Sequence, residues 1–304
     1  MFQERAATSR KALPITIVYG LVMSVLLGVI DKGLWLQFSC VSIATYVMVI
    51  LNNHYSLIRI YSRLVSCTFL VLTIMSARLS NLSEASIVQL LFAVHLFFLF
   101  RTYQERESMG AVCASFLMIG FISTLFIQIL FLVPFLWILL GTRIQAGSAK
   151  NYAASFIGLI IPYWFWGAYC LWTNSYTYIA EHVTSIAVFH PFSTDILEPH
   201  LLITLTFIAI LGICGTLRFV RYSYNDSIKT RMMFYSSITL FLLILAFVIL
   251  QPQHSNFLLK LLIITVSPII AHYFIFSRSW LTNYFFISSL VIAILLTIYN
   301  AWVP

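Results

Sequence analysis

Long apolar runs, broken by short polar stretches, make up most of the chain. They predict helices at 13–30, 34–51, 60–76, 85–100, 109–123, 126–141, 152–172, 201–217, 232–250, 257–276 and 284–299. Apolar runs approaching about 20 residues are typical of membrane spans. The sequence therefore predicts an all-α, polytopic transmembrane protein of about eleven helices, with residues 1–304 forming a single transmembrane domain.

The segment 109–141 decides the topology, because it is too long for one span and slightly short for two. We interpret it as a short helical hairpin with Thr124 and Gln128 near its tip. If it were a single span, every later helix would invert, and the basic cluster at 218–231 would lie outside. Cytoplasmic loops carry the excess of lysine and arginine, so the charge distribution favours the hairpin.

Composition supports this class of protein. The chain is 61% hydrophobic and 9% charged, whereas soluble domains carry about 25% charged residues. With the N-terminus in the cytoplasm, only Lys32, Arg78 and Lys260 of the 17 basic residues fall outside. The predicted orientation is therefore N-terminus in and C-terminus out. Because basic residues report orientation in such a protein, the net charge of +8 is not evidence of a nucleic-acid partner.

The longest polar interval is 173–200, predicted to be an extracytoplasmic loop with an interfacial helix around Ile179–Phe189. Its acids and histidines are Glu181, Asp195, Glu198, His182, His190 and His200. Carboxylate with histidine suits a divalent metal, but the spacing matches no zinc pattern, and solvation of a loop also accounts for the acids. The chain has no phosphate loop or nucleotide-binding glycine pattern, so a divalent metal is the one cofactor left open.

Two acids are candidate catalytic residues at the outer boundary. Asp31 follows the first span in the tight turn "IDKGLW", where a carboxylate can act as a base or bind a cation. The alternative explanation is that Asp31 only forms the turn and is solvated at the helix end. Glu84 opens the fourth helix, where an acid also meets the positive end of the helix dipole.

Three basic groups are candidate substrate-binding residues on the same side: Arg78, His254 and Lys260. Lys260 lies one turn inside the tenth predicted helix, with His254 just before it. It either binds a lipid phosphate or extends along the helix to reach the interface. His95 and His272 lie inside apolar helices, where each is either functional or hydrogen-bonded across helices.

Three adjoining segments carry a family resemblance: "LNNHYSLIRIYSRL" at 51–64, the stretch 79–108 ending in "FRTYQERES", and 109–144 ending in "VPFLWILLGTRI". Their order resembles the membrane core of C-type glycosyltransferases, which use polyprenyl-phosphate-linked sugars at the outer face. The pattern is also similar to that of an uncharacterised family of integral membrane proteins from Bacteroidota. The resemblance covers about residues 10–170.

The resemblance implies a multi-pass protein of the bacterial inner membrane that handles a lipid-linked sugar at its outer face. Asp31 would then be the base that activates an acceptor hydroxyl, and Glu84 a second outer acid. Arg78 and Lys260 would neutralise the lipid phosphate. The expected partners are membrane lipids and a polyprenyl-phosphate-linked sugar.

Two alternatives stay open from the sequence. A transporter or flippase would place ionisable residues near the membrane midplane, where only His95 and His272 qualify. A non-catalytic scaffold for an envelope complex would need no site at all.

Overall fold

The computed structural model describes residues 2–26, 28–30, 32–77, 83–174, 176–187, 198–277 and 279–302. Every regular element in these ranges is a helix, so the all-α class is confirmed. The α-helices are α1 (Phe2–Thr8), α2 (Ala12–Leu26), α3 (Trp35–Tyr55), α4 (Leu64–Met75), α5 (Ser83–Arg101), α6 (Met109–Leu125), α7 (Val133–Thr142), α8 (Ala149–Trp172), α9 (Tyr176–Thr184), α10 (Pro199–Tyr222), α11 (Ile228–Leu250), α12 (Ser255–Phe276) and α13 (Trp280–Trp302). Each of the eleven predicted ranges overlaps one of them, and α1 and α9 are additional.

Seven of these helices, within the part of the chain that the structure describes, are long and apolar enough to cross a membrane. They are α3, α5, α8, α10, α11, α12 and α13. Shorter apolar segments lie at Ala12–Leu26, Leu64–Met75, Met109–Leu125 and Ile127–Thr142. The fold is therefore that of a multi-pass integral membrane protein.

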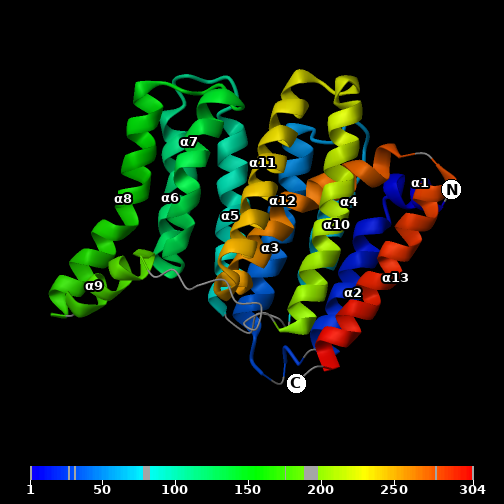
Figure 1. The fold of residues 1–304 in the computed structure, drawn as a ribbon, viewed down its shortest axis with the longest axis horizontal. Coiled ribbons are helices and arrows are strands. Elements are labelled where there is room, and N and C mark those ends of the chain that lie inside the picture. The colour runs from blue at the N-terminus through cyan, green and yellow to red at the C-terminus, as the bar shows by residue number, and fades with distance from the viewer. Residues whose placement is uncertain are drawn as a thin grey trace. The chain divides into compact units, whose positions relative to one another are not determined.

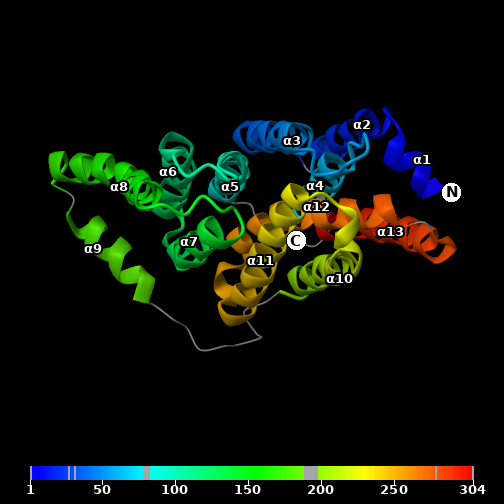
Figure 2. The same cartoon turned by 90° about the horizontal axis from the view of Figure 1, so that it is seen from above.

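The chain forms two compact units. Unit 1 comprises Met1–Gln89 and Ser193–Pro304, and unit 2 comprises Leu90–Phe192. At the centre of unit 1, α12 packs against α4, α10 and α11 (Figure 1, Figure 2). A helix that is apolar on all sides is expected to be buried, and 94% of the most apolar stretch of α12 is buried.

The outer helices of unit 1 keep apolar side chains on their surface. In α13 only 28% of the most apolar stretch is buried, and Leu281 and Trp302 are among its most exposed side chains. A large exposed apolar face marks contact with a membrane or a partner. This contrast indicates that α13 faces a membrane or a partner, whereas the protein itself covers α12.

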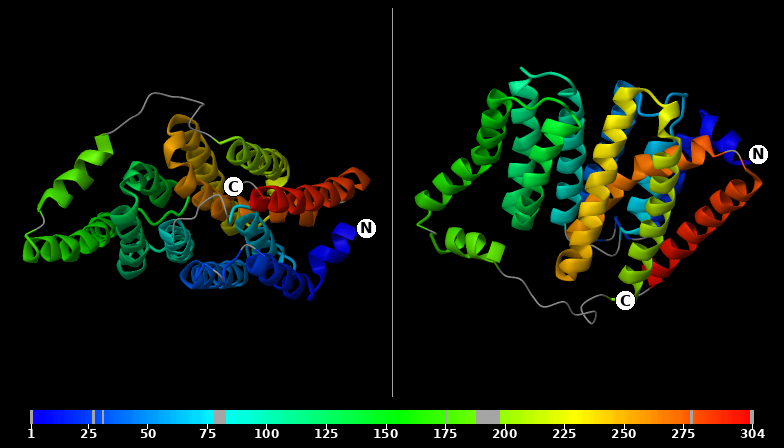
Figure 3. Two further views of the ribbon diagram at one scale, coloured as in Figure 1. Left: turned by 90° about the horizontal axis from the view of Figure 1, so that it is seen from below. Right: turned by 45° about the horizontal axis from the view of Figure 1, so that its top comes forward.

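Connections that the sequence placed on one side of the membrane meet at one end of unit 1. Arg59, in the connection before α4, donates from its guanidinium to the carbonyl oxygen of Asn225 at 2.8 Å. Asn225 lies in the turn between the antiparallel helices α10 and α11 (Figure 1, Figure 3). At the other end, the amide of Asn300 donates to the carbonyl oxygen of Met75 at 2.9 Å. Which of these two ends faces the cytoplasm remains a prediction.

Unit 2 is organised by close packing of α6 against α8. The predicted hairpin is present as two helical segments. The first, α6, ends at Leu125, and a 3-10 helix (Ile127–Leu132) then leads into α7. Between them Phe126 leaves the helical conformation, with φ −140° and ψ 87°. The turn therefore falls between Thr124 and Gln128, as the sequence predicted.

Candidate functional site

The structure describes three of the five predicted site residues. Asp31 and Arg78 lie outside the described residues. Glu84 is exposed in the first turn of α5. His254 ends the short 3-10 helix Pro252–His254 and is half-buried. Lys260 lines a cavity that neither Glu84 nor His254, the other two described residues, lines.

Lys260 is buried, with 2% of its surface exposed. Its ammonium donates to Ser76, at 3.3 Å from the carbonyl oxygen and 3.2 Å from Oγ. Ser76 is the residue that follows α4, where the negative end of the helix dipole stabilises a cation. The side chain therefore turns inward, and the expected alternative, extension to the interface, does not hold. Ser76 accepts from it at two atoms, whereas an ammonium carries three N–H donors.

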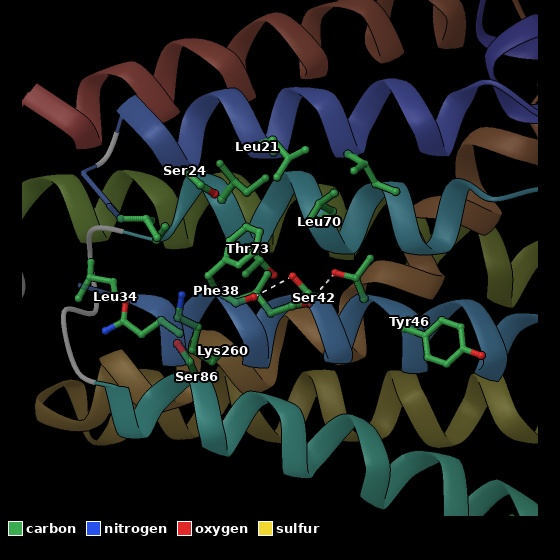
Figure 4. A pocket seen from close by; sticks show the side chains of 18 of the residues that line it. Leu21, Ser24, Leu34, Phe38, Ser42, Tyr46, Leu70, Thr73, Ser86 and Lys260 are labelled. Carbon is green, nitrogen blue, oxygen red and sulfur yellow. Dashed lines mark hydrogen bonds between the residues drawn. The ribbon is translucent and has the colours of Figure 1, made fainter. Parts of the chain in front are cut away.

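Lys260 lines a cavity of 290 Å³ within unit 1. Figure 4 shows Leu21 of α2, Phe38 of α3 and Leu70 of α4 around this space, with Lys260 and Ser86 together near one end and Tyr46 at the other. Neither Glu84 nor His254 is among the described residues that line it.

The cavity is lined by both polar and apolar side chains. The polar lining residues are Ser24, Lys32, Gln37, Ser42, Thr45, Tyr46, Thr73, Ser86 and Lys260. The remaining lining side chains are almost all aliphatic or aromatic. No carboxylate lines the cavity among the described residues, so two lysines give it a positive charge. Such a wall suits a ligand with an anionic head and an apolar chain.

A second polar cluster, which was not among the predicted sites, lies at the opposite end of α12. His272 Nε2 is 2.9 Å from Asp226 Oδ2, and both side chains are 5% exposed. Arg59 Nε lies 3.9 Å from the other carboxylate oxygen. The sequence did carry a signal, because Asp226 is the only acid in the basic stretch 218–231.

In unit 2, His95 makes the cross-helix contact that the sequence left as one of two interpretations. Its Nδ1 lies 2.9 Å from Oγ of Ser115 in α6. The rings of Phe92 and Phe116 pack against it. These contacts account for a buried histidine by packing between α5 and α6.

The predicted interfacial helix is α9, which begins three residues earlier than expected and continues as a 3-10 turn to Ala187. His182 Nε2 lies 3.1 Å from the carbonyl oxygen of Ser123. Its ring packs against Tyr163 and Trp166. Burial lowers the pKa of His182, and the hydrogen bond to Ser123 opposes that shift.

The candidate metal ligands of 173–200 are only partly described, because His190 and Asp195 lie outside the described residues. His200 pairs with Glu198 at 2.7 Å. Among the described residues, no group of three His, Cys, Asp or Glu side chains is placed to hold a metal ion.

Comparison of the chain with protein-family models, curated proteins and solved structures found no match.

Proposed function

We propose that this multi-pass membrane protein binds an anionic lipid, of the polyprenyl-phosphate-sugar class, in the cavity that Lys260 lines. The observation that carries the proposal is a buried lysine with no carboxylate partner among the described residues, facing a largely apolar space. Burying a cation is costly unless it is paired. A phosphate at this position would supply the missing negative charge.

The shape of the wall supports a lipid rather than a soluble anion. The lysine lies near one end of the cavity, and the rest of the wall includes Leu21, Phe38 and Leu70 (Figure 4). A phosphate near Lys260 would leave an attached apolar chain beside these side chains. Hydroxyls such as that of Ser86 would be available to a sugar head.

The transfer step is the finer part of the proposal. Asp31 would act as the base for an acceptor hydroxyl, since it directly precedes Lys32, which lines the cavity. Glu84 lies two residues before Ser86, which lines the cavity, and both residues are at the N-terminal end of α5. Arg78 would neutralise the lipid phosphate, as the resemblance implies.

The test is a comparison of bound lipids. The full-length protein is extracted from its own membranes in polymer discs, and retained lipids are identified by native mass spectrometry. Lys260→Met should reduce retention of a phosphate-bearing lipid by about tenfold, the effect of one charge-assisted hydrogen bond. Lys11→Met, at an exposed lysine outside the cavity, is the matched control. Equal retention in the two variants would rule out the lipid site.

A second experiment addresses the transfer step. Asp31→Asn and Glu84→Gln are introduced separately into the producing strain, and envelope glycans are measured by mass spectrometry. Loss of one glycan in either variant supports transfer. Unchanged glycans in both variants, with lipid still bound, would leave a binding protein and contradict the enzymatic part of the proposal.

A further inference from the structure

The second polar cluster surrounds its own cavity, distinct from the one that Lys260 lines. This cavity has a volume of 390 Å³ and is lined by Arg59, Ile60, Arg218, Tyr222, Asn225, Asp226, His272 and Phe276. His272 lies twelve residues after Lys260 on α12, which corresponds to about 18 Å along a helix. The two cavities therefore lie toward different ends of unit 1.

The charges around this second cavity do not cancel. Arg59 and Arg218 both line it, whereas Asp226 is its single carboxylate among the described residues. Asp226 is already engaged by His272 at 2.9 Å and approached by Arg59 at 3.9 Å. Arg218 has no carboxylate partner in the described part of the chain. Two guanidiniums and one carboxylate leave a net positive charge in a half-enclosed space.

Both arginines contact Phe276, which lines the same cavity. The guanidinium carbon of Arg59 lies 4.6 Å from the centre of the Phe276 ring. Arg218 donates through one terminal nitrogen to the carbonyl oxygen of Phe276. The Arg218 carbon also lies 5.1 Å from the ring centre of Tyr222. These contacts hold the guanidinium in place without neutralising it.

Arg218 keeps donors for a ligand. Its Nε is buried and has no hydrogen-bond partner. An unsatisfied buried donor destabilises the folded protein, so it marks a place where a partner belongs. The planar guanidinium presents two N–H groups side by side, a geometry that matches the oxygens of phosphate.

We propose that the cavity lined by Arg59 and Arg218 is a binding site for a phosphate-bearing anion. The source of the phosphate is either a free anion or the head of an anionic lipid, since both offer the same oxygens. Asp226 holds His272 at the cavity wall and limits the affinity by repulsion. The anion would join the connection before α4, the α10–α11 turn and the end of α12.

The experiment uses the full-length protein in lipid discs. In phosphatidylcholine discs, inorganic phosphate is titrated and its binding followed by ³¹P NMR. In discs that also contain phosphatidylglycerol, the retained lipid is measured by native mass spectrometry. Arg218→Gln and Arg59→Gln are compared with Arg221→Gln, an exposed arginine one turn further along α10 that does not line the cavity.

Binding of inorganic phosphate that falls about tenfold or more in Arg218→Gln, but not in Arg221→Gln, identifies a free-anion site. Retention of phosphatidylglycerol with the same variant dependence identifies a lipid site instead. Asp226→Asn should strengthen either interaction severalfold, because it removes the repelling charge while preserving the side-chain shape. This gain remains measurable even if Arg218→Gln fails to fold. The proposal is overturned if neither anion binds the unsubstituted protein, or if Arg218→Gln and Arg59→Gln bind both anions as well as Arg221→Gln does.

Discussion

Replacement of Gly158 by alanine tests the packing that organises unit 2. A Cβ at this position of α8 would lie 2.5 Å from the carbonyl oxygen of Cys113 and 3.0 Å from the backbone nitrogen of Leu117. Both atoms belong to the backbone of α6, so no side-chain rotation can relieve the overlap. Small residues at such crossings are what allow two membrane helices to approach closely.

The size of the effect follows from that geometry. Ordinary van der Waals contact begins at 3.4 Å, so α6 and α8 must separate locally by roughly 1 Å. Overpacking of this kind costs about 1–3 kcal/mol. For a domain of 150–250 residues, each kcal/mol shifts the melting temperature by about 2–4 °C. The overlap alone should therefore lower the melting temperature of Gly158→Ala by about 2–12 °C.

Gly167, on the same helix, provides the control. A Cβ there meets nothing within 4 Å. Both variants gain the higher helix propensity of alanine, about 1 kcal/mol, so their difference isolates the helix contact. Thermal unfolding of the purified protein, followed by tryptophan fluorescence, measures both. Equal melting temperatures for Gly158→Ala and Gly167→Ala would refute the close approach of α6 and α8.

Three further predictions concern polar contacts. Asn300→Leu should destabilise unit 1 by about 1–3 kcal/mol in thermal unfolding, because the buried Asn300 amide donates to the carbonyl oxygen of Met75 and would leave it unsatisfied; exposed Ser288→Ala should have no effect. The pKa of His182 is lowered by burial, so attachment of α9 should be strongest above the unfolded value of 6.5 and weaken as pH falls below it. Hydrogen exchange of residues 176–187 measures this, and His182→Gln should remove the dependence. Lys260→Met should leave the melting temperature unchanged or raised, since apolar replacements of buried charges are often neutral or stabilising; a decrease of more than about 3 kcal/mol in the free energy of unfolding would make the lysine structural.

The sequence predicted the class of fold because hydrophobic length is a local property. Each span can be read from its own residues, since a helix in lipid must satisfy its backbone within itself. The hairpin at 109–141 followed from charge and from the length of the segment. The short helix α1 was not predicted, because its position depends on remote contacts. The buried side chain of Gln3, for example, donates to the carbonyl oxygen of Ser277 at 2.9 Å.

The candidate sites could be predicted only in part, because their contacts join residues far apart in the chain. Lys260 was identified from its place in an apolar helix, but nothing near it indicated Ser76 as its partner. Because the predicted site residues were all placed at the outer boundary, Asp226 was not predicted to be a site residue. Its pairing with His272 depends on how the α10–α11 turn meets the end of α12.

The positions of Lys260 and His272 also bear on the choice between binding and transport. Both lie on α12, which is buried almost throughout. Residues 261–271 between them contain no ionisable side chain, and the hydroxyls of Thr265 and Ser267 bond to carbonyl oxygens of their own helix. A path for a charged solute needs polar groups along its length. Along α12 the ionisable side chains are confined to the two ends, an arrangement that favours two separate anion sites over one continuous path.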